Sequence, residues 1–216
     1  MRTLTPTELV ALSTNASVIE HDGLGPKVLK LSDGSFLKLF RKRPFLSRET
    51  LKPYAKRFAE NAEHLQKLGF NSPIIIGAYR LSDSVNKTAV HYWPLPGQTL
   101  RQALNDSEPE RRKFLITLFG ELLAKLHGSG IYFRSVHLGN VLIQPDGQLG
   151  LIDLADMRIG RFALSLRKRQ RNLKHMQRYS EDRHWLFEEH LNSLREGYSS
   201  ISRSCAVKLL HDFPSG

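Results

Sequence analysis

The spacing of apolar residues changes once along this chain, at the segment PLPG (94–97). Before it, short runs of strand-forming residues alternate with turns such as the Asp-Gly pair at 33–34. After it, apolar residues recur at the three- and four-residue intervals of helices, most clearly over 111–127. We therefore predict an α+β fold with two parts, in which residues 1–93 form strands plus one helix and residues 94–216 are mainly helical.

Local signals predict the elements of each part. In the first part, a Ser-Asp-Gly turn between two apolar runs predicts a hairpin, and an apolar stripe that stops at Gly69 predicts a helix. In the second part, a Pro-Asp-Gly turn joins two short strands. The expected segments are strands over 28–31, 36–40, 74–81 and 87–93, helices over 47–68 and 111–127, and a hairpin of 140–143 with 149–153.

Length and cysteine content narrow the class of protein. A chain of 216 residues can bury a core without disulfides, and with Cys205 as its one cysteine it can form none within the chain. No stretch approaches the roughly 20 apolar residues of a membrane-spanning helix, and the N-terminus has no apolar run of signal length. These features favour a cytoplasmic protein.

The charge is strongly positive and unevenly placed. The formal net charge is +11, which favours anionic partners such as phosphates, nucleic acid or the inner leaflet of a membrane. No acidic residue occurs between Met157 and Ser180. This segment is either the solvated face of a helix or a surface that docks anions. Its basic residues are Arg158, Arg161, Arg167, Lys168, Arg169, Arg171, Lys174 and Arg178.

Three polar residues stand at positions that suit phosphoryl transfer. Transfer of a γ-phosphoryl group needs a lysine on the phosphates and oxygen ligands for a metal ion. Lys38 lies inside an apolar strand, whereas a lysine between two leucines is more often an outward-facing residue. Asn140 opens one short strand and Asp153 closes its partner, so their oxygens are expected at one rim.

Two motifs carry a resemblance to a known family. YFRSVHLGNVLI (132–143) followed by GLIDLAD (150–156) resembles the catalytic loop and metal-binding motif of protein-kinase-like enzymes. The chain is most similar to bacterial proteins described as lipopolysaccharide kinase-like or toluene tolerance proteins, in the branch of the Kdo and heptose kinases. The resemblance implies a two-lobed fold with a small N-lobe, a helical C-lobe and no long activation segment.

The resemblance also implies roles for individual residues. Lys38 would bind the ATP phosphates and pair with a helical acid, with Glu60 as the first choice and Glu63 as the second. Asn140 and Asp153 would hold Mg²⁺, and the turn at Gly23 and Gly25 would cover the phosphates. The adenine would meet backbone groups of the hinge, for which the expected residues are Tyr92, Trp93 and Leu95.

One position departs from the family pattern. Ser135 stands where the catalytic loop normally has an aspartate that orients the acceptor hydroxyl. Loss of a general base typically costs 10²- to 10⁴-fold in rate. His137 either substitutes for that aspartate or supports the loop. Asp156 either holds a second metal ion or starts the following segment as a cap.

These observations predict an ATP- and Mg²⁺-dependent kinase that acts on a sugar or glycolipid such as lipopolysaccharide core, in the cytoplasm or peripherally at the inner membrane. The alternative is a pseudokinase scaffold in envelope biogenesis or stress tolerance, which Ser135 favours. The segment 158–178 is compatible with a glycolipid or an anionic membrane surface. A nucleic-acid binder is a weaker third hypothesis, because no aromatic platform accompanies the charge.

Overall fold

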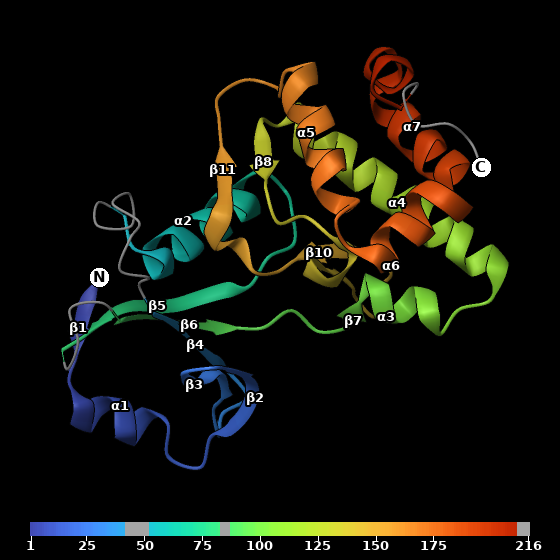
Figure 1. Ribbon diagram of the computed structural model, residues 1–216. Helices are drawn as coiled ribbons and strands as arrows, with labels where there is room; N and C mark the ends of the chain where they lie inside the picture. The colour runs from blue at the N-terminus through green and yellow to red at the C-terminus, as the bar shows by residue number, and fades with distance from the viewer. Residues whose placement is uncertain (42–51, 83–86, 211–216) are drawn as a thin grey trace. The chain divides into compact units, whose positions relative to one another are not determined.

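The computed structural model describes residues 1–41, 52–82 and 87–210 (Figure 1). Its contacts divide the chain into two units. Unit 1 comprises Met1–Leu95 and Asp153–Asp156, and unit 2 comprises Pro96–Ile152 and Met157–Gly216. We predicted one division after residue 93, whereas here the boundary follows Leu95 and a four-residue segment from the second half joins unit 1. The predicted α+β class is confirmed, because unit 1 is built on a sheet and unit 2 is mainly helical.

Unit 1 is built on one six-stranded sheet. Its order is β1 (Arg2–Leu4), β5 (Ile74–Leu81), β6 (Lys87–Trp93), β4 (Phe36–Arg41), β3 (Gly25–Lys30) and β2 (Ser17–Asp22). The β1–β5 pair is parallel and the other pairs are antiparallel. The predicted hairpin is the β3–β4 pair. The sequence did not indicate β1, which is only three residues long.

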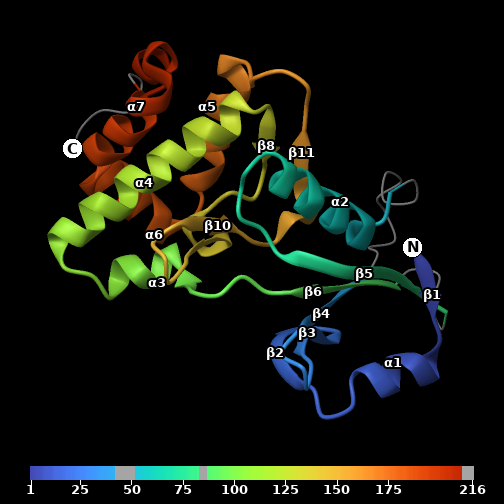
Figure 2. The same cartoon turned by 180° about the vertical axis from the view of Figure 1, so that it is seen from behind.

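A helix covers each face of this sheet (Figures 1 and 2). Residues that alternate along a strand point to opposite faces. On one face, Leu37 of β4 belongs to an apolar cluster onto which helix α1 (Pro6–Leu12) packs through Leu9 and Leu12. On the other face, the ring of Phe40 meets Phe58 of helix α2 (Tyr54–Lys67). Both faces of β4 are therefore covered. The predicted helix over 47–68 is confirmed over its described part, and residues 47–51 lie outside the described residues.

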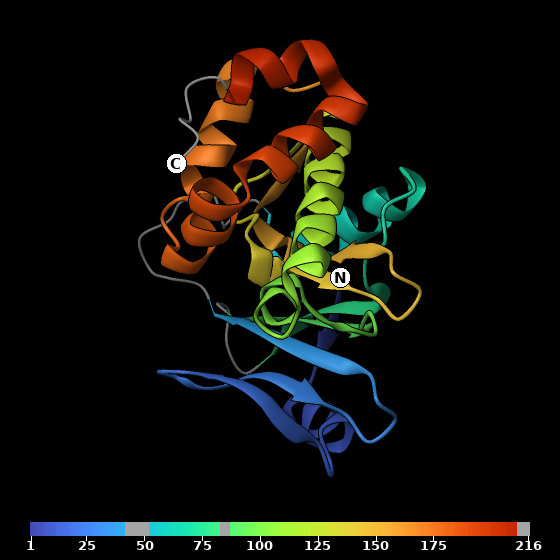
Figure 3. The same ribbon diagram turned by 90° about the vertical axis from the view of Figure 1, so that its right-hand side faces the viewer.

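Unit 2 is organised around α4 (Pro109–Gly128), the helix predicted over 111–127. Figure 3 shows α7 (Leu191–Leu210) and α5 (Leu166–Met176) beside it. The shorter helical segments of unit 2 are α3 (Leu100–Asn105), η2 (Leu138–Asn140), α6 (Ser180–Arg183) and the π-helical turn η4 (His184–Glu189). Two small sheets complete unit 2. One contains β7 (Gln98–Thr99), β9 (Val141–Ile143) and β10 (Leu149–Leu151), and the other contains β8 (Ile131–Phe133) and β11 (Met157–Ile159). The short helix η3 (Leu154–Asp156) belongs to unit 1.

The crossing of α4 and α7 brings their backbones into direct contact. A Cβ atom built on Gly197 of α7 would lie 1.9 Å from the carbonyl oxygen of Thr117 in α4. A Cβ atom on Gly120 of α4 would lie 2.6 Å from the carbonyl oxygen of Leu194 in α7. These distances are far below van der Waals contact, so only glycine fits at either position. The two helices pack closely because each supplies a glycine at the crossing.

Candidate functional site

Lys38 is buried and ion-paired within unit 1. It lies on the α2 face of β4 between Phe36 and Phe40, with 6% of its surface exposed. Its Nζ donates to Oδ1 of Asp153 at 2.7 Å. A buried ammonium group needs such a partner, because its desolvation is costly. Since both faces of the sheet are covered, Lys38 is not the outward-facing lysine that its local sequence most often indicates.

Asp153 has an unusual backbone conformation. Its φ is +55°, in the left-handed region that residues other than glycine rarely adopt. The segment Leu154–Asp156 that follows is tied to α2, because Asn61 Nδ2 donates to the Leu154 carbonyl oxygen at 2.7 Å. Strained residues that the surrounding structure holds in place occur often at functional sites. The fold thus holds the Asp153 carboxylate, 41% exposed, against Lys38.

The predicted ion pair between Lys38 and Glu60 is wrong. Glu60 of α2 pairs with Lys52 and, at 3.8 Å, with Lys56. Glu63, the second choice, is exposed. The residue of α2 that reaches the Asp153 segment is Asn61, which sequence reasoning missed. A signal was present, because Asn61 falls on the apolar stripe of the helix, where a polar residue needs a buried partner.

The segment between β8 and β9 contains three further residues of the predicted catalytic set. They are Ser135, His137 and Asn140, all within unit 2. Asn140 is buried, and its Nδ2 donates to the Ser135 carbonyl oxygen at 2.9 Å. This bond fixes the amide plane and directs Oδ1 to the opposite side of the side chain. The Ile152 N–H donates to the Asn140 carbonyl oxygen at 3.0 Å, so the backbone just before Asp153 runs beside Asn140. The predicted hairpin is the β9–β10 pair.

His137 is bound into this loop. Its Nδ1 accepts the Gly139 N–H at 3.0 Å, which caps the η2 turn. Its ring packs against Tyr179, with ring centroids 4.5 Å apart. These contacts correspond to the loop-supporting role that was one of the two alternatives for His137.

Asp182 also contacts this loop, and the sequence analysis did not predict it. It is fully buried in α6, and its Oδ2 accepts the Leu138 N–H at 2.8 Å. Its Oδ1 accepts from Arg101 Nη2 at 2.6 Å. The carboxylate therefore joins α3, α6 and the loop. No local signal could have found it, because an acidic residue in the first turn of a helix is usually exposed.

A chain of buried hydrogen bonds supports the start of the loop from behind. Asn172 of α5 donates to the Phe133 carbonyl oxygen at 2.7 Å, and its Oδ1 lies 3.2 Å from His127 Nε2. His127 Nδ1 lies 2.9 Å from the Tyr198 hydroxyl, which accepts from Arg169 at 2.7 Å. Every donor has an acceptor when Tyr198 donates to Nδ1 and Nε2–H donates to Asn172. Burial, and secondarily the nearby Arg169, lowers the pKa of His127 to about 4, so its imidazole is neutral.

The predicted phosphate-covering turn lies between β2 and β3. Gly25 has a φ of +113°, and Leu24 beside it is 75% exposed. The turn is braced by Arg41, whose Nη1 donates to both carboxylate oxygens of Asp22 at 2.7 and 2.8 Å. Gly23 has no atom within 4 Å of the position of a Cβ. The backbone at Gly23 is thus open, while the turn around it is fixed.

The predicted hinge residues differ in what they expose. The Tyr92 side chain is buried against Phe36 and Phe58, and its burial raises the pKa of the phenol. Trp93 is 42% exposed, and Leu95 is half-buried. Because prolines precede and follow Leu95, it carries the only backbone N–H in the stretch 94–96.

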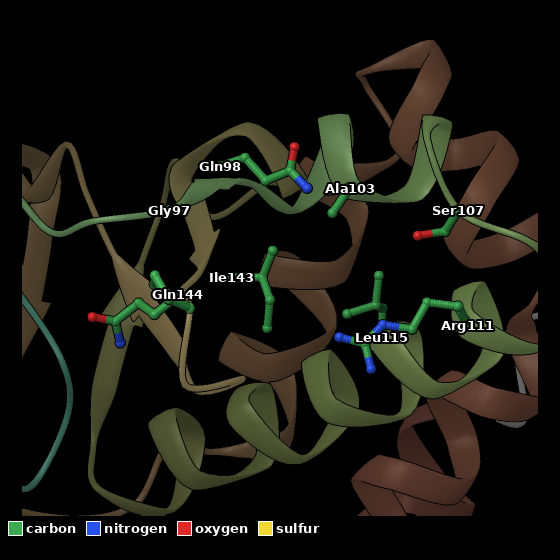
Figure 4. Close-up of a pocket in the computed structure, with 9 residues that line it drawn as sticks. Gly97, Gln98, Ala103, Ser107, Arg111, Leu115, Ile143 and Gln144 are labelled. Carbon is green, nitrogen blue, oxygen red and sulfur yellow. The ribbon is translucent and has the colours of Figure 1, made fainter.

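A pocket of about 320 Å³ lies within unit 2, between β7, α3, α4 and the β9–β10 hairpin (Figure 4). Its polar lining comes from Gln98, Ser107, Arg111 and Gln144, and none of the predicted site residues lines it. In the part of the chain that is described, no group of three or more His, Cys, Asp or Glu side chains is placed to hold a metal ion.

The predicted ligands nevertheless suit magnesium. Mg²⁺ prefers hard oxygen ligands and is usually held by one or two protein groups together with water and nucleotide phosphates, not by an all-protein cage. The Asp153 carboxylate is partly exposed, and the Asn140 amide is fixed by its bond to Ser135. Both groups have the chemistry that this cation requires.

No helix among the described residues is long and apolar enough to cross a bilayer.

Comparison with known proteins gives one family. Residues 96–198 match the family described as "Lipopolysaccharide kinase (Kdo/WaaP) family". The match includes Ser135, His137, Asn140 and Asp153, whereas Lys38 lies outside it. The match contains both motifs, 132–143 and 150–156, on which the resemblance to lipopolysaccharide kinases rests. No curated protein matches the chain significantly.

Among solved structures, the chain is similar to "the bifunctional kinase-methyltransferase WbdD", with 18% identity and a TM-score of 0.49 over 88% of this chain and 43% of that one. It is also similar to "monomeric WbdD", with 20% identity and a TM-score of 0.43 over 65% of this chain and 34% of that one. The chain therefore spans less than half the length of these proteins.

Proposed function

Because residues 96–198 carry the pattern of lipopolysaccharide kinases, we propose that this chain is an ATP- and Mg²⁺-dependent phosphotransferase that acts on a hydroxyl group of a sugar or glycolipid. The observation that carries the proposal is the ion pair of buried Lys38 with the partly exposed Asp153, whose backbone is held in the left-handed region. A lysine held against a carboxylate in this way supplies two of the groups that phosphoryl transfer requires. We further propose that the protein works in the cytoplasm, at or near the inner membrane.

In this proposal, Lys38 and Asp153 bind each other in the free protein and bind different groups once the nucleotide is present. Lys38 would neutralise the phosphates, and Asp153 and Asn140 would each offer an oxygen ligand to Mg²⁺. When bound, Mg²⁺ would supply positive charge to the nucleotide phosphates. Without nucleotide, Lys38 and Asp153 neutralise each other, so neither is left as an uncompensated charge. The open backbone at Gly23 is suited to close approach of a phosphate.

The adenine would be recognised by the backbone of the hinge. Leu95 supplies the N–H donor, because Pro94 and Pro96 have none. Trp93, which is partly exposed, offers an apolar surface next to it.

The transfer itself breaks the bond between the γ-phosphorus and the bridging oxygen of ATP and forms a bond to the acceptor oxygen, which releases ADP and one proton. The transition state is loose, so positioning and charge neutralisation supply most of the acceleration. Ser135 can orient the acceptor hydroxyl by hydrogen bonding but cannot accept its proton as a carboxylate would. His137 is used to support the loop. We therefore expect slow transfer, with the proton leaving to solvent.

A second function, a nucleotide-binding scaffold without transfer activity, is favoured by Ser135. The two functions share the same nucleotide site and differ only in turnover. A third function, nucleic-acid binding, is supported only by the net charge and the cluster of basic residues over 158–178.

Thermal unfolding with and without Mg²⁺-ATP tests nucleotide binding. At about 100 times its Kd, ATP should stabilise the protein by about 2.7 kcal/mol. That corresponds to a rise in Tm of roughly 5–10 °C for a chain of this size. Lys38→Ala and Asp153→Ala should each abolish the rise, and Lys30→Ala, an exposed lysine on neighbouring β3, should retain it. An unchanged Tm in the parent protein would rule out the nucleotide site.

Turnover then separates the enzyme from the scaffold. Transfer of phosphate from ATP to lipopolysaccharide core fragments should be measurable in the parent protein and absent in Asp153→Ala. If the parent protein binds Mg²⁺-ATP but transfers nothing, and Ser135→Asp restores transfer, the scaffold function is the correct one.

A further inference from the structure

Seven basic side chains are exposed on one stretch of unit 2, which comprises β11, the loop 160–165 and α5 with the residues that follow it. Three of them, Arg167, Arg171 and Lys174, are spaced four and three residues apart on α5, so they share one face of the helix. We call the whole set the basic surface, and its members are Arg158, Arg161, Arg167, Lys168, Arg171, Lys174 and Arg178.

Within the described residues, these charges form no ion pair that would stabilise the fold. No acidic residue occurs from 158 to 179, and no ion pair joins any of the seven to another of the described residues. Like charges four residues apart on a helix are destabilising. The buried face of the same helix behaves differently, because Arg169 there donates to Leu164 and Tyr198. The exposed charges are therefore available to a partner outside the chain.

The loop 160–165, which joins β11 to α5, exposes an aromatic side chain. Phe162 is 84% exposed, the most exposed of the large apolar residues described. The backbone around it is fixed, because the Gly160 N–H donates to the Gly130 carbonyl oxygen at 3.0 Å and the Leu164 N–H donates to the His127 carbonyl oxygen at 2.8 Å. Leu164, two residues on, is buried. The loop thus buries one apolar side chain and holds the other in solvent, between Arg161 and α5.

We propose that the basic surface binds the anionic face of a phospholipid bilayer, with Phe162 inserted between the headgroups. Cations that lack partners within the chain gain attraction at an anionic leaflet, and an aromatic ring is at home at the boundary between headgroups and acyl chains. Nucleic acid is the less suitable anion. Single strands are bound in basic grooves with several stacking aromatics, whereas this surface lies on the outside of a helix and carries one ring.

The inference goes beyond the phosphotransferase proposal and is independent of it, since it requires neither nucleotide nor transfer. It is tested by sedimentation of the full chain with vesicles of phosphatidylcholine alone and with added phosphatidylglycerol. The protein should sediment with the phosphatidylglycerol vesicles only, and rising salt should release it. Each basic residue near an anionic leaflet strengthens binding by roughly fivefold. The combined variant Arg167→Gln, Arg171→Gln, Lys174→Gln should therefore bind about 100-fold more weakly.

A matched control removes three charges elsewhere. The combined variant Lys67→Gln, Lys113→Gln, Lys125→Gln has the same net charge, and its positions are exposed on α2 and α4. It should keep nearly all of the binding, because only charges that face the bilayer contribute locally. Equal loss in both variants would overturn the proposal, since it would reduce the effect to net charge.

Phe162→Ala tests the insertion. It should weaken vesicle binding by about tenfold at any salt concentration, because the lost contact is apolar. The Tm of Phe162→Ala should equal that of the parent protein, since the ring is exposed. Binding of the parent protein to both vesicle types alike, or to neither, would refute the proposal. So would tighter binding to a single-stranded oligonucleotide than to phosphatidylglycerol vesicles at the same salt.

Discussion

The carboxylate of Asp182 accepts the backbone N–H of Leu138 at 2.8 Å, across 44 residues of sequence. The same carboxylate is paired with Arg101, and no part of it is exposed to solvent. This side chain therefore helps to fix the position of the loop that contains Ser135 and Asn140.

Asp182→Ala should destabilise the protein by about 3 kcal/mol, because it leaves the Leu138 N–H without its acceptor and Arg101 without its buried partner. The measurement is the free energy of unfolding in urea. Glu181→Ala is the matched control, since Glu181 also pairs with Arg101 but is 54% exposed. It should cost no more than about 0.5 kcal/mol. Similar losses in the two variants would contradict the role of Asp182.

Tyr198→Phe should destabilise the protein by about 2 kcal/mol. The hydroxyl group links Arg169 to His127, and its removal leaves Arg169 Nη1 and His127 Nδ1 without this bond, although each residue keeps its other bond, to Leu164 and to Asn172. Tyr179→Phe, which removes a hydroxyl from a residue that is 41% exposed, should change the free energy of unfolding by less than about 0.5 kcal/mol. A neutral Tyr198→Phe variant would show that the chain of hydrogen bonds does not support the loop.

Stability should fall as the pH is lowered from about 6.5 to about 4. The pKa of His127 is lowered from 6.5 to about 4 in the folded protein, so across this range the unfolded chain binds a proton that the folded chain does not. The full shift corresponds to about 3 kcal/mol. Burial also lowers the pKa of His91 and His190. The contribution of His127 is therefore the difference in slope between the parent protein and a variant that lacks this histidine. His127→Gln should show a distinctly shallower slope than the parent protein between these pH values, and parallel slopes would contradict the prediction.

Gly197→Ala should destabilise the protein by about 3 kcal/mol or more, because its methyl group would overlap the Thr117 carbonyl oxygen and force α4 and α7 apart. Gly128→Ala makes the same chemical change in the last turn of α4, where no atom lies within 4 Å of the new methyl group. That variant should be neutral or stabilising by up to about 1 kcal/mol. Thermal unfolding of the two variants compares them directly.

The parts of the fold that could be predicted are those with a strong local signal. The limits of β5 and β6 were predicted to the residue, since both strands are apolar runs bounded by polar turns. Helix α4 has a broad apolar face and was predicted to within two residues. By contrast, β1, β8 and β11 are three residues long and exist only through pairing with distant segments. The three-residue strands β9 and β10 could be predicted because a Pro-Asp-Gly turn joins them, a local signal that β1, β8 and β11 lack.

The site divides in the same way. Lys38, Asn140 and Asp153 were predicted from their order and spacing, and the structure pairs Lys38 with Asp153. The partner of Lys38 was not, because the choice between Glu60 and Asp153 depends on the rotation of α2 and on the left-handed turn at Asp153. Asp182 and Asn61 were missed since each acts on a backbone group far away in sequence. Side chains that bind distant backbone atoms have no signature in a single sequence.

Helix α5 faces two ways. Asn172 on its inner side bonds to the carbonyl oxygen of Phe133, two residues before Ser135, while Arg171 next to it points to solvent. The width of one helix, about 10 Å, is thus all that separates the outer surface of the molecule from the backbone that leads into the loop. A partner that binds to the outer face of α5 would therefore act on that backbone through the hydrogen bond between Asn172 and Phe133.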